Sequence, residues 1–315
     1  MSTTASDPTR LGSGRVRRGD GVFRSTTTAA GVLILLILAG VTIFLVSESV
    51  PAFTAAPEDV IGGEGFARYV GPLVFGTVLA AAIALVVGAP LGVGIALYLS
   101  HFAPRRLAYG LGYLVDLLAA VPSIVFGLWG LATFGPFLVP AYAWLAEHAS
   151  WIPFFAGPAL LSGRTILTAG LVLAVMILPV VTALSREIFR QTPRLHEEAA
   201  LALGATRWEM IRYSVLPYGR SGVVSAAMLG LGRALGETMA VVLILSASGG
   251  VSLNLISAEN PGTIPANIAS QFPEATGLEI NTLIATGLVL FVLTFAVNFA
   301  ARAIVNRRAE YSGAN

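Results

Sequence analysis

The feature that most constrains this chain is a succession of apolar runs, each long enough to cross a lipid bilayer. A membrane-spanning helix needs about 20 mostly apolar residues. Over the whole chain 56% of the residues are hydrophobic and 11% are charged, whereas about 25% are charged in a typical soluble domain. This composition excludes a disordered chain and argues strongly against a soluble globular domain. We therefore predict an all-α integral membrane protein.

Six runs qualify as transmembrane helices, and they divide the chain into a short first part and a longer core. The first predicted helix covers residues 29–46, after a basic N-terminal tail at 1–28. The run is longer than the usual 7–15-residue core of a signal peptide and no clear cleavage site follows it, so we expect it to be retained. The predicted core covers residues 70–305, and a short tail follows at 306–315. The other five predicted spans are residues 72–99, 107–134, 165–188, 219–246 and 280–305.

The distribution of arginine sets the expected orientation of these spans. All 19 basic residues are arginine. If the N-terminus is inside, sixteen of them fall in cytoplasmic segments, Arg68 and Arg164 fall outside, and Arg233 falls within a span. Basic residues collect in cytoplasmic loops. The bias therefore predicts six spans with both termini in the cytoplasm.

Missing residue types exclude several kinds of chemistry. The chain has no cysteine and no lysine, which excludes thiolate nucleophiles, cysteine-bound zinc, a Walker A phosphate loop and Schiff-base catalysis. The three histidines lie in different loops and show no metal-ligand spacing. Basic and aromatic residues do not alternate in a soluble domain, so nucleic acid is not an expected partner. We expect no catalytic residue, metal or cofactor in this chain, and any ATP would be bound by another chain.

Two ionisable residues stand inside the fifth predicted span. Arg233 lies near its middle and Glu237 follows four residues later, so on a continuous helix both side chains share one face and can meet. A charged side chain at membrane depth costs about 2.5–3.5 kcal/mol on insertion scales, so it needs a partner or a purpose. Two interpretations stay open. The pair fixes helix packing, or it belongs to a polar pathway in which the guanidinium donates to an oxyanion.

The third predicted span is interrupted by proline and glycine. Pro122 removes a backbone donor and kinks a helix, and Ser123 follows it. Kinks at mid-membrane are commonest where backbone lines a cavity, and a packing kink without a ligand is the equal alternative. Asp116 lies nearer the membrane interface, where a capping or pairing role is favoured. Residues 138–162 contain three prolines and are predicted to form an external interfacial segment.

Residues 190–220 form the one sizeable cytoplasmic loop that is expected to be structured. A helical stretch with acidic residues near its start ends at Gly204, a second short stretch follows, and Leu216-Pro217 is expected to stop it. A short amphipathic helix–turn–helix of this kind fits the groove of a partner protein. The alternative is a helix pair that lies on the lipid surface.

The loop contains Glu198-Ala199-Ala200, then Gly204, then Leu216-Pro217. This pattern resembles a known motif, the EAA loop of ABC importer permeases, which docks on the ATPase subunit. Ser214 departs from the family pattern, which usually has an apolar residue there. Residues 120–130 and 229–241 narrow the resemblance to the phosphate-specific PstC family of permeases. The loop residues that match the EAA motif are Glu198, Ala199, Ala200, Gly204, Leu216 and Pro217.

The resemblance implies a fold and a set of partners. It implies the type I ABC importer permease fold in the inner membrane of a bacterium. It also implies a heterodimer with a second permease, PstA, two copies of the ATPase PstB, which uses ATP and Mg, and the external phosphate-binding protein PstS. This chain itself would bind no cofactor.

The resemblance also implies roles for particular residues. Arg233 and Glu237 would take part in phosphate passage, Pro122 and Ser123 would belong to the same substrate pathway, and the EAA residues would couple to the ATPase. Two alternatives stay open: a self-contained secondary anion transporter or channel, and an ABC permease for another oxyanion such as molybdate or sulfate. No convincing internal repeat supports a secondary transporter, which would also leave the loop at 190–220 unexplained.

Overall fold

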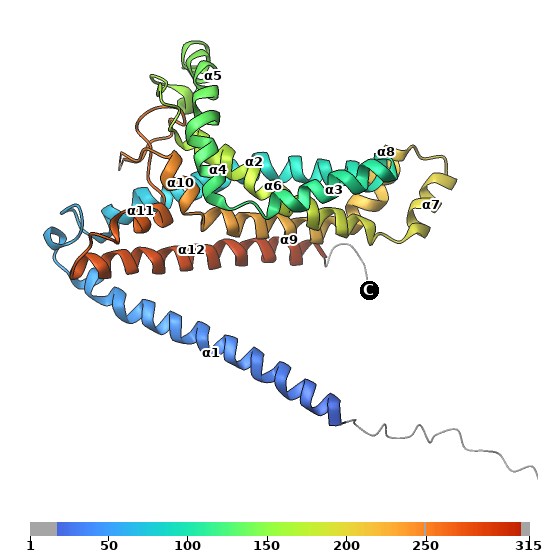
Figure 1. Ribbon diagram of the computed structural model, residues 1–315, viewed down its shortest axis with the longest axis horizontal. Coiled ribbons are helices and arrows are strands. Elements are labelled where there is room, and N and C mark those ends of the chain that lie inside the picture. The colour runs from blue at the N-terminus through green and yellow to red at the C-terminus, as the bar shows by residue number, and fades with distance from the viewer. Residues whose placement is uncertain (1–17, 249, 310–315) are drawn as a thin grey trace, which may run out of the picture. The chain divides into compact units, whose positions relative to one another are not determined.

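Figure 1 shows the computed structural model, which describes residues 18–248 and 250–309. Within these residues the regular elements are helices, with one isolated β-bridge between Ala247 and Asn260. The all-α prediction is therefore confirmed. The α-helices are α1 (Arg18–Thr54), α2 (Phe66–Leu97), α3 (Arg105–Ala119), α4 (Ser123–Trp129), α5 (Gly135–His148), α6 (Ile166–Arg190), α7 (Arg194–Ala202), α8 (Arg207–Met210), α9 (Leu216–Leu235), α10 (Met239–Ile244), α11 (Ile264–Gln271) and α12 (Leu278–Ala309).

The first helix is longer than the sequence predicts. α1 begins at Arg18, inside the predicted tail at 1–28, and ends at Thr54, beyond the predicted end of 29–46. Its polar residues stay helical because hydroxyl groups bond back to the preceding turn; the Thr26 hydroxyl, for example, donates to the Val22 carbonyl at 2.9 Å. Residues 1–17 lie outside the described residues. Residues 1–48 and 49–315 form two separate compact units.

Among the described residues, five helical stretches are long and apolar enough to cross a membrane, judged by length and composition. The predicted span 219–246 is not among them, because α9 ends at Leu235. At the C-terminus, α12 continues to Ala309, so the predicted tail at 306–315 begins inside a helix, and residues 310–315 lie outside the described residues. The five stretches are Gly21–Thr54, Phe66–Phe102, Ser123–His148, Ile166–Arg190 and Leu278–Ala303.

The predicted third span, 107–134, is wrong as a single helix. α3 ends at Ala119, and a new helix starts at Ser123 and runs through α4, a wide π-type turn and α5 to His148. Pro122 causes the break because it lacks an N–H group and disfavours the helical conformation in the residue before it. The first part of the interfacial segment predicted at 138–162 therefore belongs to a regular helix, which extends away from α2, α6 and α9 (Figure 1).

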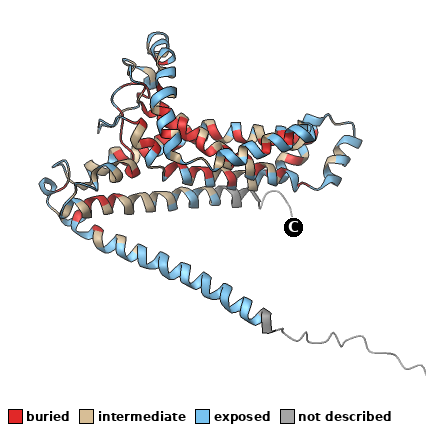
Figure 2. Cartoon of the chain, viewed as in Figure 1, coloured by how far each residue is buried: buried red, intermediate tan, exposed pale blue. Residues whose placement is uncertain are grey.

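The core forms where α2, α6 and α9 pack side by side. α6 lies between the other two and supplies large, fully buried side chains such as Ile177 and Val181. Small residues of α2 face them, and a Cβ atom on Gly88 would lie 2.8 Å from the Ile177 side chain. Close contact between these helices therefore depends on glycine. Figure 2 shows the buried residues concentrated in this part of the bundle.

A buried asparagine joins three segments near one end of this core. The Asn260 side chain is fully buried, and its oxygen accepts from the Ile166 backbone N–H at 2.9 Å. Its amide nitrogen donates to the carbonyls of Arg164 and Ser246, both at 3.2 Å. One side chain thus satisfies backbone groups at the start of α6 and after the end of α10. The sequence analysis did not identify Asn260.

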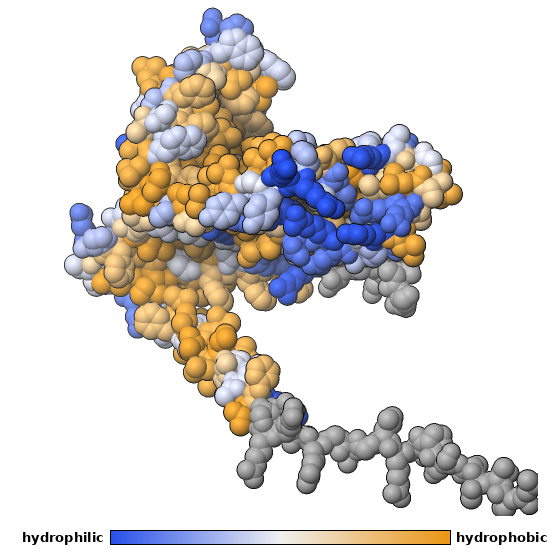
Figure 3. Space-filling model, turned by 45° about the vertical axis from the view of Figure 1, so that its right-hand side comes forward, coloured by the Kyte–Doolittle hydropathy of each residue, from blue (hydrophilic) through white to orange (hydrophobic). Residues whose placement is uncertain are grey.

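The two ends of the bundle carry different elements. α7 and α8 lie at one end, and α10 and α11 lie at the opposite end (Figure 1). On the face seen in Figure 3, hydrophilic side chains gather toward the end that carries α7 and α8, while hydrophobic side chains dominate the middle. This polarity matches a helical bundle with an apolar belt and one strongly polar end.

Candidate functional site

The segment that contains Arg233 and Glu237 is broken between them. α9 ends at Leu235, and α10 begins at Met239. Glu237 lies in the break, where its carboxylate accepts a hydrogen bond from the Ala240 backbone N–H at 3.2 Å. Because Glu237 is outside α9, the predicted i,i+4 pairing on one helix face is wrong, and no ion pair joins these two residues in the described structure. Discontinuous helices of this kind are found at transport sites.

Arg233 instead faces a groove between α9, α12 and α6. The groove encloses about 1030 Å³. Its polar side chains are Ser225 and Arg233 of α9 and Asn298 and Arg302 of α12, and the remainder of its lining is apolar or glycine. No carboxylate lines it. A guanidinium in such surroundings can donate several fixed hydrogen bonds to an oxyanion. From the sequence, Arg302 is only one of the sixteen arginines expected in cytoplasmic segments.

Pro122 and Ser123 lie beside this region but not in the groove. Pro122 precedes the first residue of α4, and neither residue belongs to the groove lining. α4 instead packs on α10: a Cβ atom on Gly127 would lie 2.9 Å from the Cα of Ala240. The structure therefore packs α4, which follows the Pro-Ser turn, on the helix that Glu237 caps, and the pathway role of Pro122 and Ser123 stays a prediction.

The loop at 190–220 has the helix–glycine–helix form that the sequence predicts. α7 ends at Ala202, and Gly204 has a φ of +88°, a conformation that favours glycine. α8 then starts with a capping box, in which the amide and hydroxyl of Thr206 donate to the Glu209 carboxylate. These hydrogen bonds lower the pKa of Glu209 below its ordinary value. The carboxylate therefore holds the cap at neutral pH.

The outer surface of this loop is exposed. Glu198 and Ala199 are exposed, whereas Ala200 packs against the small core beneath the loop. Large apolar side chains are also exposed, including Leu203, at 90%, and Trp208, at 56%. Exposed apolar side chains gathered on a short helical hairpin are typical of a docking surface.

The expected stop at Leu216-Pro217 is wrong. α8 runs through a π-type turn at Ile211–Val215 directly into α9, so the helix continues from Arg207 to Leu235. Pro217 comes just after this π-type turn and has no N–H group to donate to the turn before it. The wide turn before it absorbs the clash that proline would otherwise make with the preceding turn.

One contact holds the loop against the bundle, and a second joins the two halves of the loop. His101 Nε2, at the end of the α2 segment, lies 3.6 Å from the Glu197 carboxylate of α7. The Ser214 hydroxyl donates to the His196 carbonyl at 3.3 Å. The serine that departs from the EAA pattern therefore ties the two halves of the loop together, which the sequence pattern alone did not indicate.

Asp116 has the pairing role that the sequence favours. Its carboxylate lies 3.6 Å from the Arg186 guanidinium of α6. Gly112 permits this contact, because a Cβ atom there would collide with the guanidinium. The ion pair therefore joins α3 to α6 near the end of the bundle that carries α7.

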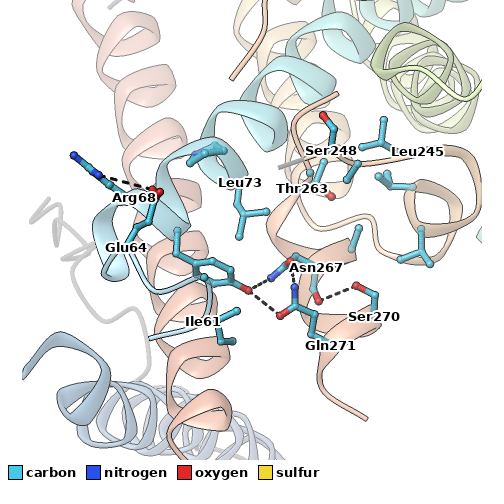
Figure 4. Close-up of a pocket in the computed structure, with 18 residues that line it drawn as sticks. Ile61, Glu64, Arg68, Leu73, Leu245, Ser248, Thr263, Asn267, Ser270 and Gln271 are labelled. Carbon is cyan, nitrogen blue, oxygen red and sulfur yellow. Dashed lines mark hydrogen bonds and ion pairs between the residues drawn. The ribbon is translucent and has the colours of Figure 1, made fainter. Parts of the chain in front are cut away.

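A second cavity, of about 560 Å³, opens between α2, α10 and α11 (Figure 4). Three of its side chains form a closed ring of hydrogen bonds. Asn267 Nδ2 donates to the Tyr69 hydroxyl at 2.6 Å, Tyr69 donates to Gln271 Oε1 at 3.1 Å, and Gln271 Nε2 donates to Asn267 Oδ1 at 2.9 Å. Because the three side chains satisfy one another, they clamp α11 to α2.

The family of the chain follows from comparison with known proteins. Residues 88–310 match the family described as the inner membrane component of binding-protein-dependent transport systems. The chain belongs to this family. A "phosphate transport system permease protein PstC 2" of Mycobacterium tuberculosis is 47% identical over 91% of this chain and 92% of that protein. A PstC of Mycobacterium leprae is 45% identical over 96% of this chain and 98% of that protein.

Solved transporter structures share the fold of this permease-family chain. A bacterial ABC transporter described as importing the acidic polysaccharide alginate has a subunit that aligns with a TM-score of 0.56, 16% identity and coverage of 93% of this chain and 97% of that one. The methionine ABC transporter MetNI, in an inward-facing conformation, aligns with a TM-score of 0.53, 18% identity and coverage of 77% and 95%. These likenesses show that the fold is that of ABC transporter permeases.

The glycine turn of the loop gives a first test. Gly204→Val is expected to reduce transport at least about tenfold while the protein still inserts in the membrane, because a β-branched residue at positive φ is strained by roughly 1–3 kcal/mol and re-aims α7. No atom lies within 4 Å of an added Cβ at this position, so the effect would come from the backbone and not from a steric clash.

The measurement is ATPase co-purification and uptake, normalised to the membrane level of the protein. Gly250→Val, at a glycine that also has open space around it, is the matched control. Unchanged uptake in Gly204→Val would show that the orientation of α7 does not affect coupling to the ATPase.

Proposed function

We propose that this chain is the membrane-spanning permease subunit of an ATP-driven importer of inorganic phosphate. The observation that carries the proposal is Arg233, an arginine that faces a groove without a carboxylate, in a chain whose relatives are named phosphate permeases. The groove offers a positive, largely apolar surface to a small oxyanion. Half of the path would come from this chain and half from a second permease of the PstA type.

The energy would come from a separate ATPase. The exposed face of α7 and α8 provides the docking surface, with Glu198, Ala199 and Gly204 in the positions of the EAA motif. Two copies of a PstB-type ATPase would bind ATP and Mg, and this chain would bind no cofactor. A PstS-type binding protein would deliver phosphate from outside the membrane.

The proposed topology has six crossings with both termini in the cytoplasm. The fifth crossing in chain order is made by α9 together with α10, which the break at 236–238 divides, and α12 makes the sixth. The strong excess of arginine in the predicted cytoplasmic segments supports this orientation. It places the tails 1–28 and 306–315, together with the loop at 190–220, on the inner side of a bacterial plasma membrane.

Reconstitution tests this function directly. The chain, its partner permease, the ATPase and the binding protein are placed in liposomes that contain ATP, and uptake of labelled phosphate is measured. We expect uptake that requires ATP and that a tenfold excess of sulfate or molybdate does not suppress.

Phosphate uptake by this chain alone would support a secondary transporter or channel instead. Preferential uptake of sulfate or molybdate would retain the ABC permease and change its cargo. Omitting the ATPase from otherwise identical liposomes is the control.

A further inference from the structure

We propose that the groove between α9 and α12 carries the oxyanion from Arg233 to Arg302, and that Arg302 is its second contact. This inference rests on the proposed function and extends it. It assigns to Arg302, Asn298 and Ser225 a role in binding that neither the sequence pattern nor the family assigned. The ligand is a phosphate-class oxyanion.

The polar residues of α9 and α12 line the same groove. α12 runs beside α9 in the opposite direction (Figure 1). On α9 the polar lining residues are Ser225 and Arg233, eight positions apart, which is about 12 Å along a helix. On α12 they are Asn298 and Arg302, one turn apart. The four polar side chains thus follow one groove toward the end of the bundle that carries the coupling loop.

The groove contains two positively charged side chains, Arg233 and Arg302. Both Arg233 and Arg302 are exposed in the groove, and no carboxylate lies among its lining residues or within ion-pair distance of either guanidinium in the described structure. Arg302 also lies within the apolar stretch that ends at Ala303. Two arginines without counter-charges in largely apolar surroundings are unfavourable unless an anion or water is present. An oxyanion with two negative charges would neutralise both.

Besides the two arginines, the groove contains two uncharged side chains that can form hydrogen bonds, Ser225 and Asn298. Asn298 offers an amide group that can donate to an anion, and Ser225 offers a hydroxyl that at present donates to the Ser221 carbonyl at 2.9 Å. Phe295 and Phe299, stacked with ring centroids 6.4 Å apart, form an apolar part of the wall. A few polar groups on an apolar wall suit an anion that must bind weakly enough to leave.

A lipid headgroup could present the same phosphate chemistry to these arginines. The transported anion is the better occupant because the groove extends along α9 from Ser225 to Arg233. Between these two residues it is lined by the apolar side chains of Met228 and Leu229. A headgroup would bind at one end of the groove, near Arg302, and would leave Arg233 without an anion.

A cysteine reporter tests occupancy of the groove. The chain has no cysteine, so Ser225→Cys introduces a single thiol in the groove, and its labelling rate is measured in the assembled complex with a charged thiol reagent. We expect inorganic phosphate to slow labelling at least about threefold. Ser221→Cys, one turn away and outside the groove lining, is the control and should be unaffected.

The lipid composition of the vesicles separates the two sources of phosphate. Labelling is repeated in vesicles of uncharged, phosphate-free glycolipid and in vesicles with added anionic phospholipid. Protection by inorganic phosphate in both supports the proposal. Protection that follows the anionic lipid and not inorganic phosphate overturns it.

Uptake measurements test Arg302 itself. Arg302→Gln is expected to lower phosphate uptake about tenfold, the loss that follows from removing one charge-assisted hydrogen bond, and Arg302→Lys should recover part of it. Arg106→Gln removes an arginine that is exposed but lies outside the groove and controls for the loss of a cytoplasmic positive charge.

Failure of this inference is distinguishable from failure of the proposed function. If Arg302→Gln transports at the wild-type rate and phosphate does not protect Ser225→Cys, while Arg233→Gln still lowers uptake at least about tenfold, the path does not follow this groove. If Arg233→Gln also transports normally, the proposed role of Arg233 fails as well.

Discussion

Phosphate uptake is expected to fall by roughly ten- to a hundredfold when Arg233 is replaced by glutamine, while the complex assembles and hydrolyses ATP. The guanidinium contributes charge-assisted hydrogen bonds to the anion, each worth about 1.5–3 kcal/mol. Arg233 is exposed in its groove and pairs with no described carboxylate, so its loss leaves no buried charge behind. The measurement is uptake normalised to assembled complex.

Two variants serve as controls for this result. Arg233→Lys keeps the charge and should retain part of the uptake, although lysine lacks the planar fork of arginine. Glu237→Gln keeps an oxygen that can accept from the Ala240 N–H, so the cap of α10 should survive. Because the two residues are not paired, their effects on stability should be additive. If the double variant Arg233→Leu with Glu237→Leu restores uptake, the two residues contribute only to packing.

Replacing Asn260 with alanine is expected to lower the free energy of unfolding by about 2–5 kcal/mol, because it removes three hydrogen bonds from fully buried positions and unmade bonds of this kind cost about 1–3 kcal/mol each. The backbone N–H of Ile166 would lose the partner that the structure gives it, and the ends of α6 and α10 would separate. The thermal unfolding midpoint in detergent measures this effect.

Asn260→Asp separates the hydrogen bonds from the volume of the side chain. Aspartate fills the same space and can still accept from Ile166, but it turns an oxygen toward the carbonyls of Arg164 and Ser246 in place of a donor. It should therefore be about as destabilising as alanine. Asn298→Ala, at an exposed asparagine, should change the midpoint little. Equal midpoints for wild type and both Asn260 variants would contradict the role of this residue.

Local patterns predicted those elements whose causes are local. The apolar runs predicted α2, α6 and α12, because hydropathy over about 20 residues determines a membrane helix. The loop at 190–220 was predicted well because Gly204 is needed where φ is positive and because charge and periodicity around it are helical. Residues of α7 and α8 are exposed, and docking of an ATPase on them stays a prediction.

Breaks and continuations of helices were predicted less well. The sequence suggested a stop at Pro217 and continuity from Arg233 to Glu237, and the structure has the reverse in both places. A proline usually ends or kinks a helix, but here a π-type turn at Ile211–Val215 comes just before it, and such a turn cannot be recognised from composition. At 236–238, the carboxylate of Glu237 accepts from the Ala240 N–H of the next helix. This side-chain hydrogen bond replaces a backbone hydrogen bond of a continuous helix.

Residues whose role depends on distant contacts could not be found from the sequence. Asn260 bonds to groups 94 and 96 positions away in the chain, and Arg302 joins Arg233 in one groove only because α12 packs beside α9. Neither residue carries a local signal. The Asp116–Arg186 pair was half predicted, since the need for a partner follows from the charge but the identity of the partner does not.

The continuous helix from Arg207 to Leu235 has a mechanical consequence. Its 29 residues span about 43 Å at 1.5 Å per residue, and it carries Trp208 of the docking surface near one end and Arg233 near the other. No loop interrupts it, and its only irregularity is one π-type turn. A displacement of Trp208 by a bound ATPase would therefore move Arg233 with it, because both lie on one continuous helix. The break at 236–238 is the first point after Arg233 where the chain leaves the helix, so it is where that displacement could become a rotation of the next helix.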